Sequence, residues 1–203
     1  MISLPRLYAI LDTSCFAHGE DLLKTAEELA AAGLTLLQYR NKSGNARQML
    51  EQARELRERL GNSAKLIMND RADLALAAGF DGVHVGQEDL SAEGARKVIG
   101  ALWLGVSTHN PEQVIEADNT SADYIAVGPV FATSSKTKPD PVIGLDGVRR
   151  ARELTRKPLV AIGGITRTNC RSVIEAGADS VAVISDLVRE PQKSAEEFLR
   201  ILR

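Results

Sequence analysis

A run of polar residues spaced two apart follows one of the apolar segments of this chain. Gln38, Arg40 and Lys42 alternate with Tyr39 and Asn41. In an extended strand, residues two positions apart point to the same side, so these three side chains share one side of the chain. Arginine can hold a phosphate or carboxylate through two parallel hydrogen bonds, and a neighbouring lysine adds a second positive charge. The pattern favours an anion clamp; the alternative is a solvated pair of loop charges.

Two aspartates, Asp70 and Asp89, come shortly after two further apolar segments. If neighbouring strands bring their carboxylates together beside phosphate-binding groups, the pair suits Mg²⁺, which takes one or two carboxylates together with the phosphates of a substrate. Each aspartate could instead be a helix N-cap, a position that this residue fills well. We predict a Mg²⁺ site at Asp70 and Asp89 and keep helix capping as the alternative.

Glycines and a hydroxyl follow the last two apolar segments, as Gly163-Gly164 and as Ile184-Ser185. Glycine lets the backbone come close to a phosphate, whose oxygens accept hydrogen bonds from backbone N–H groups and helix N-termini. If the two segments are the last strands of an α/β barrel, the loops after them form the usual phosphate site of that fold. We therefore predict a phosphate site here, with an ordinary tight turn as the alternative.

A long stretch without a helical or strand pattern, 128–144, holds three prolines, two lysines and several hydroxyls. A compact domain seldom keeps so long a loop unless the loop has a function. The hydroxyls and lysines suggest an anionic ligand, and the alternative is a solvated surface loop. We also expect Lys138 and Pro139–Pro141 to form a stiff hinge for a lid over the ligand.

The three histidines and a serine give weaker signals. His84 lies within an apolar segment, where a packed and hydrogen-bonded side chain is commoner than a catalyst. His109 precedes a predicted helix closely, and His18 is expected at the surface. Ser107 ends an apolar segment and offers a hydroxyl at the same edge as the groups above. No pairing of a nucleophile with a base is evident.

Short apolar segments alternate with amphipathic helical patterns along the chain, and this alternation must position the residues above. The segments are apolar throughout, as in strands that are buried on both faces of a parallel sheet. Eight strand–helix units in 203 residues predict a single-domain (β/α)8 TIM barrel over residues 1–203. The predicted strands are 7–11, 34–38, 65–69, 82–85, 102–107, 124–127, 158–162 and 180–184, and the predicted helices are 20–32, 46–60, 70–78, 91–99, 111–117, 145–154, 168–176 and 194–202.

An internal echo supports the repeated unit. Ala-Gly-Phe-Asp-Gly-Val at 78–83 resembles Ala-Gly-Ala-Asp-Ser-Val at 176–181, and Ala-Gly-Leu at 32–34 is a fragment of the same pattern. Each copy reads as a helix end, a glycine cap and a strand start. The main alternative, a doubly wound sheet, usually carries Gly-x-Gly-x-x-Gly after its first strand, and residues 12–18 show nothing similar. In a barrel the active site lies where the strands end, which is where the polar residues fall.

Composition limits the class of protein and its partners. A net charge of −2 and an aromatic content of 4% argue against a nucleic-acid partner. Cys15 and Cys170 lie far apart and read as reduced thiols. Residues 1–6 do not resemble the start of a signal peptide, and no apolar run reaches the length of a membrane span. We expect a cytoplasmic protein with small-molecule partners and no membrane contact, and a homo-oligomer is compatible with the sequence.

Taken in order, these segments resemble the thiamine-phosphate synthase family, from the first predicted strand to the last. This family joins 4-amino-5-hydroxymethyl-2-methylpyrimidine diphosphate to a thiazole phosphate and releases pyrophosphate. No single motif is decisive, but the ordered set is specific. The resemblance rests on Gln38-x-Arg40-x-Lys42, Asn69-Asp70-Arg71, Asp81-Gly-Val-His-Val-Gly-Gln87-x-Asp89, Gly105-Val-Ser107, Gly128-Pro-Val-Phe-x-Thr133-x-Ser135-Lys136 and Ile162-Gly-Gly-Ile165.

The resemblance implies a role for each matching residue. It implies that Mg²⁺ is held by Asp70 and Asp89, and that positive charges and a hydroxyl stabilise the departing pyrophosphate. That catalytic group comprises Arg40, Lys42, Lys136 and Ser107. The implied contacts to the pyrimidine diphosphate are Gln38, Arg40, Lys42, Asn69, Ser107 and Lys136. The implied contacts to the thiazole phosphate are Thr133, Ser135, Gly164, Ile184 and Ser185.

Three other functions fit parts of the pattern. A thiazole tautomerase is a relative on the same barrel, but such relatives tend to lose the diphosphate-binding set that this chain keeps. A phosphate-binding barrel that serves only as a sensor or scaffold has no need of a paired metal site to neutralise a leaving group. An aldose-phosphate epimerase or isomerase needs a metal–histidine set or an acid–base pair, and only His84 is suitably placed. We therefore predict the synthase, a transferase.

Overall fold

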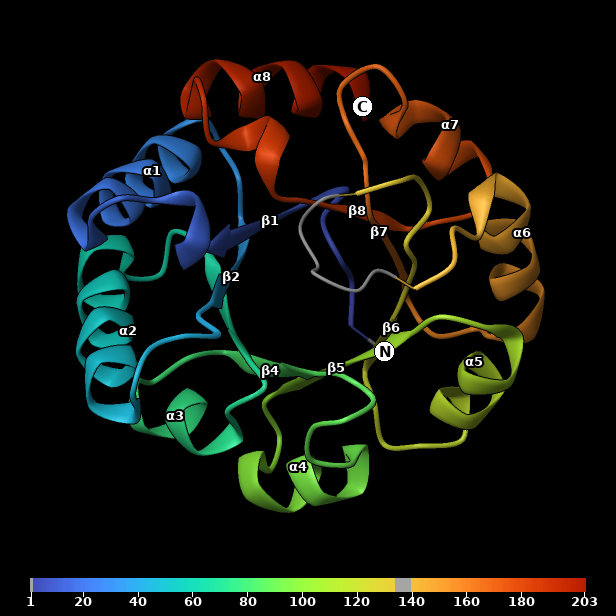
Figure 1. Ribbon diagram of the computed structural model, residues 1–203, viewed down its shortest axis with the longest axis horizontal. Helices are drawn as coiled ribbons and strands as arrows, with labels where there is room; N and C mark the ends of the chain where they lie inside the picture. Colours follow the sequence, from blue (N-terminus) through green and yellow to red (C-terminus); the bar gives the residue numbers. More distant parts are fainter. Residues whose placement is uncertain (1, 134–139) are drawn as a thin grey trace.

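The protein is described from a computed structural model, which covers residues 2–133 and 140–203. Within these residues eight parallel strands close into a barrel in chain order, and helices surround it as an outer ring (Figure 1). The predicted (β/α)8 barrel is confirmed. Its strands are β1 (Leu7–Asp12), β2 (Leu36–Arg40), β3 (Lys65–Asn69), β4 (Gly82–Val85), β5 (Trp103–Thr108), β6 (Tyr124–Val127), β7 (Leu159–Ile162) and β8 (Ser180–Val183).

One α-helix follows each strand, and two short 3-10 helices lie in the loops after the first and last strands. Among the described residues, no helix combines the length and the apolar character needed to cross a membrane. The α-helices are α1 (Gly19–Ala31), α2 (Ala46–Leu60), α3 (Ala72–Ala77), α4 (Ala92–Ile99), α5 (Pro111–Asp118), α6 (Gly144–Leu154), α7 (Cys170–Glu175) and α8 (Pro191–Ile201), and the 3-10 helices are η1 (Thr13–Cys15) and η2 (Ser185–Leu187).

The predicted bounds of β2 were wrong by two residues at each end. Leu34 is not a strand residue, because its N–H donates to Leu29 O at 3.1 Å and completes the C-terminal cap of α1. Gly33, with a φ of 95°, makes the left-handed turn that such a cap requires. The strand then extends to Arg40, which places the arginine within the sheet.

The core has two layers on either side of the strands. The larger layer lies between the strands and the helices and is built from leucine, alanine and valine side chains. The smaller layer fills the inside of the barrel, and it contains two tyrosines among aliphatic side chains. The buried members of this inner layer are Tyr8, Ile10, Leu36, Ile67, Tyr124, Ala126, Val160 and Ala182.

A repeated polar contact ties the starts of the strands to the helices, and we call each copy a strand-start bridge. In each one, an aspartate just before an even-numbered strand accepts the N–H of a leucine in the preceding odd-numbered strand, at 2.8 or 2.9 Å. The same carboxylate accepts from an arginine of an even-numbered helix. The three bridges are Arg57–Asp81–Leu66, Arg96–Asp123–Leu104 and Arg152–Asp179–Leu159. The sequence echo at 78–83 and 176–181 therefore contains the aspartates of two bridges.

Candidate active site

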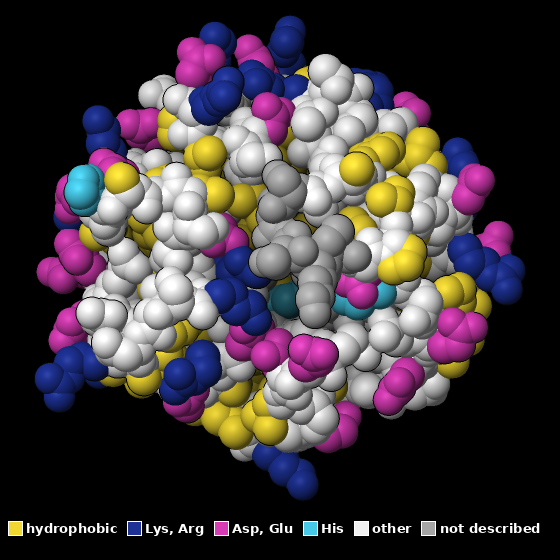
Figure 2. Space-filling model, viewed as in Figure 1, with side chains coloured by type: hydrophobic (Ala, Val, Ile, Leu, Met, Phe, Trp, Pro, Cys, Tyr) yellow, Lys and Arg dark blue, Asp and Glu magenta, His cyan; other side chains and the backbone are white. Residues whose placement is uncertain are grey.

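The predicted anion clamp lies at the mouth of the barrel, where the strands end. Arg40 is the last residue of β2, and its Nη1 donates to the Asp12 carboxylate. Lys42 follows in the next loop, and its Nζ donates to the Asp70 carboxylate. In Figure 2, which views the barrel along its axis, basic and acidic side chains lie together near the centre of the visible face. The two cations of the clamp thus meet carboxylates from neighbouring strands.

Asp12 is a member of this group that sequence reasoning missed. It ends β1 directly opposite Arg40 in the β1–β2 register and is only 3% exposed. Its Oδ1 accepts from Ser14 N at 3.0 Å and from Ser14 Oγ at 2.7 Å. The carboxylate is therefore fixed by the first turn of η1 and can orient the guanidinium of Arg40. A signal existed in the sequence, since a carboxylate directly after the first strand falls at the barrel mouth.

The predicted metal ligands, Asp70 and Asp89, lie beside each other. Asp70 has a φ of 63°, the only positive value found for a non-glycine residue in the described chain. A backbone in this region costs on the order of 1 to 3 kcal/mol and is commonly found at functional sites. Burial and the adjacent Asp89 raise the pKa of the Asp70 carboxyl, against the opposing effect of Lys42. Asp89 Oδ2 accepts the N–H of Gly86 at 2.8 Å, which turns this carboxylate back over its own loop.

Helix capping does not explain either aspartate. Arg71 occupies the N-cap position of α3, which lacks a side-chain cap, and the helix begins at Ala72 rather than at the predicted Asp70. The N-cap of α4 is Ser91, whose hydroxyl accepts the N–H of Gly94 at 3.2 Å. Neither carboxylate is therefore used as a helix cap, and their partners are Lys42 for Asp70 and the N–H of Gly86 for Asp89.

Asn69, the residue before Asp70, ends β3 and is 8% exposed. Its Nδ2 is a buried donor that finds no hydrogen-bond acceptor among the described residues. An unsatisfied buried amide costs about 1 to 3 kcal/mol, so such a group in a folded protein calls for a ligand or water partner. Asn69 thus presents a donor at the mouth, next to the two carboxylates.

Gln38 and Ser107 each contact a buried side chain inside the barrel. Gln38 Nε2 donates to Tyr8 Oη at 2.7 Å, and Ser107 Oγ lies 2.8 Å from His84 Nε2. His84 is buried and hydrogen-bonded, as expected for a strand histidine. The tyrosine partners were not predicted, because the sequence gives no signal of which side chains meet across the interior of a closed barrel.

The predicted phosphate site after β7 has the backbone conformation that needs glycine. Gly163 and Gly164 have φ values of 102° and 62°. A Cβ on Gly164 would lie 2.5 Å from Ala132 O and 2.8 Å from Phe131 Cβ, which is closer than real contacts allow. The loop after β6 therefore packs directly on this glycine, and Phe131 N donates to Gly163 O at 3.0 Å. Thr133 lies two residues beyond this contact.

Ile184 and Ser185 lie where β8 ends and η2 begins. The next residue, Asp186, joins this turn to the loop after β7. It accepts from Arg167 N at 2.9 Å, from Arg167 Nε at 3.1 Å and from Arg167 Nη2 at 3.0 Å. Arg167 Nη1 also donates to Glu197 of α8 at 2.5 Å. The two loops that carry Gly164 and Ser185 are thus held together, and neither Arg167 nor Asp186 was among the predicted residues.

Several predicted positions of the long loop cannot be placed. Ser135, Lys136, Lys138 and Pro139 lie outside the described residues. His109 contacts the two described ends of this loop. Its Nδ1 donates to Gly128 O at 2.6 Å, and its Nε2 lies 3.5 Å from the carboxylate of Asp140. The predicted lid and hinge stay predictions.

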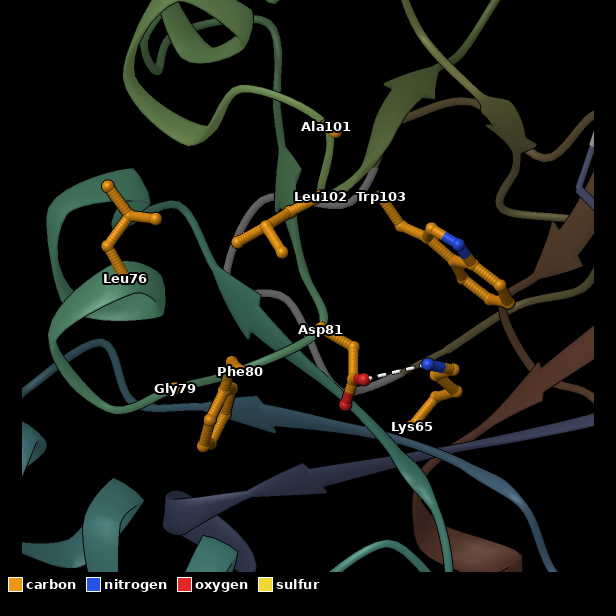
Figure 3. Close-up of a pocket in the computed structure, with 8 residues that line it drawn as sticks. All are labelled: Lys65, Leu76, Gly79, Phe80, Asp81, Ala101, Leu102 and Trp103. Atoms are coloured by element: carbon orange, nitrogen blue, oxygen red, sulfur yellow. Dashed lines mark hydrogen bonds and ion pairs between the residues drawn. The ribbon is translucent and has the colours of Figure 1, made fainter.

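A groove of about 500 Å³ lies at the opposite end of the barrel, where the strands begin (Figure 3). Lys65 and Asp81 pair across it at 2.9 Å, and the Lys65 ammonium lies 5.8 Å from the centre of the Trp103 ring. These groups belong to a strand-start bridge and its surroundings. The groove contains none of the predicted site residues, so the candidate site is the mouth.

Comparison with known proteins shows the family of this chain. The profile of the family described as thiamine monophosphate synthase matches residues 7–187. A thiamine-phosphate synthase of Koribacter versatilis is 62% identical over 99% of this chain and 97% of its own length. One from Chloroflexus aurantiacus is 45% identical over 90% of this chain and 85% of its own.

A solved structure gives the same result for the fold. The thiamine phosphate pyrophosphorylase from Pyrococcus furiosus superimposes with a TM-score of 0.85. It is 36% identical, and the match covers 97% of this chain and 95% of that one. The family profile extends over nearly the whole barrel, and the relatives match over nearly their whole length. This chain belongs to the thiamine monophosphate synthase family.

Proposed function

We propose that the chain catalyses the reaction of thiamine-phosphate synthases, the joining of a pyrimidine diphosphate to a thiazole phosphate in thiamine biosynthesis. The observation that carries the proposal is the meeting of Arg40, Lys42, Asp70 and Asp89 at one mouth of the barrel. Positive charge stabilises the negative charge that develops on a departing pyrophosphate, and a metal held by carboxylates would add to the charge of the basic side chains. A tautomerase or a passive phosphate sensor has no use for this combination.

The pyrimidine diphosphate would occupy the side of the mouth formed by β2, β3 and β5. Arg40 and Lys42 would bind the diphosphate oxygens, with Arg40 already oriented by the buried Asp12. The unpartnered donor of Asn69 and the amide of Gln38 would bind polar atoms of the pyrimidine, and Ser107 would bind the diphosphate. From the long loop, Lys136 would add a further positive charge.

Asp70 and Asp89 fit Mg²⁺ better than a metal that needs a complete protein cage. Among the described residues, no group of three or more His, Cys, Asp or Glu side chains could hold a metal. Two adjacent carboxylates match the preference of Mg²⁺ for few protein ligands, with phosphates and water completing its shell. Bound there, Mg²⁺ would neutralise charge on the diphosphate. Lys42, which contacts Asp70, would add its positive charge to the same diphosphate.

The thiazole phosphate would lie on the opposite side, over β7 and β8. Gly164 would offer its backbone N–H to the phosphate, while Ile184 and Ser185 lie at the start of the turn after β8. Thr133 and Ser135 of the long loop would cover it. Holding both substrates at fixed positions removes much of the entropic barrier to their reaction.

The reaction itself needs no protein nucleophile. The bond between the pyrimidine methylene carbon and the diphosphate oxygen breaks, and its electron pair leaves with pyrophosphate. The electron-rich aminopyrimidine stabilises the positive charge on the methylene carbon. The lone pair of the thiazole nitrogen forms the new C–N bond, and the positive charge remains on the thiazolium ring. The protein contributes position and electrostatic stabilisation.

A direct assay tests the proposal. Purified protein is incubated with both substrates and Mg²⁺, and thiamine phosphate and pyrophosphate are measured. Equal amounts of the two products are expected, and their absence with and without metal would contradict the function. Asp89→Ala should abolish Mg²⁺-dependent turnover and leave the thermal midpoint of unfolding nearly unchanged. Asp73→Ala is the matched control, because this aspartate is exposed on α3 and forms its ion pair with the partly exposed Arg71.

A further inference from the structure

A continuous line of hydrogen-bonding side chains crosses the inside of the barrel, and we call it the interior chain. It joins five strands, β2, β1, β6, β4 and β5, in that order. The successive contacts are Gln38 Nε2 to Tyr8 Oη at 2.7 Å, Tyr8 Oη to Tyr124 Oη at 3.2 Å, Tyr124 Oη to His84 Nδ1 at 3.1 Å, and His84 Nε2 to Ser107 Oγ at 2.8 Å. Its two ends, Gln38 and Ser107, are both predicted substrate contacts.

Gly105 of β5 leaves space for the interior chain, because it has no side chain. A Cβ on Gly105 would lie 2.1 Å from Tyr124 Cζ and 2.4 Å from His84 Nδ1. Any other residue at this position would displace the contact between the two rings. Tyr8 and Tyr124 are 1% and 0% exposed, so their hydroxyls lie out of reach of bulk water. Polar groups buried this deeply have to satisfy one another.

A count of donors and acceptors along the interior chain leads to the direction of the bonds that we infer. Burial raises the pKa of both phenols, so each tyrosine keeps one proton to donate. Tyr8 Oη accepts from the Gln38 amide, and Tyr124 is the remaining described group to which Tyr8 can donate. If Tyr8 donates to Tyr124 Oη, the proton of Tyr124 is directed to its other contact, His84 Nδ1 at 3.1 Å. The bonds therefore run in one direction, from Gln38 toward His84.

This direction determines the state of the last two members. If His84 Nδ1 accepts a proton, the neutral imidazole carries its hydrogen on Nε2, which faces Ser107 Oγ. Ser107 Oγ then accepts from His84, and its own hydrogen points away from the imidazole. At the other end, Gln38 uses its amide N–H toward Tyr8 and keeps its carbonyl oxygen for another donor.

We propose that the interior chain holds His84 as the Nε2–H tautomer and thereby turns the hydroxyl hydrogen of Ser107 toward the barrel mouth as a fixed donor to an anionic oxygen. Tyr8, Tyr124 and His84 are positioning residues, which act through Ser107 and do not touch the substrate oxygen. The identity of that oxygen, on the departing diphosphate, rests on the proposed function. The tautomer of His84 and the direction of the bonds do not depend on the proposed function.

A donor that is oriented before the substrate binds stabilises the transition state more than a hydroxyl that can rotate. Removing one donor of this kind from an active site typically lowers kcat by about a hundredfold to a thousandfold. Releasing its orientation while keeping the hydroxyl should cost less, on the order of tenfold. The loss should appear in kcat, because charge on the leaving oxygen grows as the bond breaks.

The first experiment measures the tautomer without any turnover. The chain has three histidines, so nitrogen-15 labelling of the imidazole rings gives a spectrum that can be assigned with His18→Gln and His109→Gln variants. Correlations between the ring nitrogens and ring hydrogens distinguish the two neutral tautomers. The Nε2–H form is expected for His84. The Nδ1–H form would reverse the direction of the chain and overturn the proposal.

The second experiment breaks the chain at one bond. Tyr124→Phe removes the hydroxyl that donates to His84 Nδ1, so the fixed Nε2–H tautomer should give way to a mixture or to the Nδ1–H form. We expect kcat to fall by about tenfold and the KM for the thiazole phosphate to change less than about threefold. Tyr8→Phe keeps the bond between Tyr124 and His84, so its effect on both readouts should be smaller.

Tyr39→Phe is the matched control. Tyr39 is also fully buried, and its hydroxyl also donates one hydrogen bond, to Gln52 Oε1 at 2.7 Å. This bond lies on the helix side of the sheet, away from the interior chain. The control should lose stability to a similar extent while keeping the His84 tautomer and, within about twofold, kcat. If Tyr124→Phe behaves like Tyr39→Phe in both readouts, the positioning role is excluded. If the wild-type protein forms no thiamine phosphate but shows the Nε2–H tautomer, only the proposed function fails.

Discussion

Single residues at the mouth are held in place by partners that do not themselves face the predicted ligands. Asp12 fixes the guanidinium of Arg40, and Ser14 in turn fixes Asp12 through two hydrogen bonds. A buried carboxylate of this kind keeps an arginine oriented, which matters for a side chain that binds phosphate through two parallel bonds. The mouth therefore depends on residues one contact away from the substrate.

Asp12→Asn tests this dependence. The amide can still contact Ser14 but no longer attracts the guanidinium, so Arg40 should lose its fixed orientation. We expect kcat/KM for the pyrimidine diphosphate to fall by about tenfold, with the KM for the thiazole phosphate unchanged. Steady-state kinetics with each substrate varied in turn gives both values. Glu20→Gln, which breaks the exposed two-bond pair with Arg59 far from the mouth, is the control and should leave both values unchanged. Equal effects of the two substitutions would remove Asp12 from the site.

Residue positions along strands could be predicted, but side-chain partners across strands could not. The spacing of Gln38, Arg40 and Lys42 was sufficient to place them on one side, because strand geometry is local. The meeting of Tyr8 with Tyr124, 116 residues apart, depends on the closure and register of the whole barrel. No local pattern contains that information, and the same holds for the contact of Arg167 with Asp186.

At the scale of elements, an arginine–aspartate pair lies at each end of β8: one joins α6 to the residue before this strand, and the other joins the loops after β7 and β8. At the strand starts, Arg152 donates to Asp179 at 3.0 Å as part of a strand-start bridge. At the mouth, Arg167 donates three bonds to Asp186. Both pairs end on the segments that flank β8, but only the second lies next to Gly164 and Ser185. The two pairs therefore separate a contribution to stability from one to ligand binding.

Arg167→Gln should weaken the binding of the thiazole phosphate specifically. Without the guanidinium, the loops after β7 and β8 lose their mutual connection, and the phosphate site between them loses its fixed width. We expect the KM for the thiazole phosphate to rise by about tenfold and the KM for the pyrimidine diphosphate to change less than twofold. Arg152→Gln should lower the thermal midpoint with neither KM altered. If Arg152→Gln raises the KM for the thiazole phosphate as much as Arg167→Gln does, the rise in KM reflects a general loss of stability and not a specific effect on the phosphate site.

Boundaries of elements were less predictable than their order. α8 begins at Pro191, three residues before the predicted Ser194, because proline suits the first turn of a helix, where its missing N–H is not needed. The turn η2 was not predicted, since a three-residue 3-10 helix has no hydrophobic period to detect. In both cases single residues decide the outcome, and periodicity carries little information.

At the scale of the whole molecule, the eightfold order of the barrel could be predicted because every unit repeats one simple pattern. Strands buried on both faces must be apolar throughout, and the helices that cover them must be apolar along one stripe. The echo at 78–83 and 176–181 reflects a structural repeat with a period of two strand–helix units. This repeat is the strand-start bridge. Asp123 belongs to the same series, although the sequence around it, Ser121-Ala122-Asp123, lacks the glycine of the other two copies.

The bridges predict how the stability of the barrel depends on pH. Burial alone would raise the pKa of Asp81, but the bonds from Leu66 N, Lys65 and Arg57 outweigh it and leave the pKa below its ordinary value. A carboxyl with a lowered pKa in the folded chain stabilises the fold when it is ionised. That stabilisation is present above a pH of about 4, where unfolded aspartate is ionised, and it is lost as the pH falls through the lower folded value.

Asp81→Asn should therefore destabilise the protein at pH 7 by about 1 to 2 kcal/mol. A hydrogen bond to a charged group contributes about 1.5 to 3 kcal/mol, and solvent screening lowers this for a carboxylate that is 22% exposed. At pH 3 the difference from the wild type should shrink, because protonation removes the charge of Asp81 in the wild type as well. Urea unfolding at both pH values measures the difference in unfolding free energy between Asp81→Asn and the wild type. Asp146→Asn is the control, since this aspartate is almost fully exposed beside Arg149 and should change the unfolding free energy at neither pH. A difference that stays constant from pH 7 to pH 3 would mean that the charge of Asp81 contributes nothing, and that the bridge holds the strands through its geometry alone.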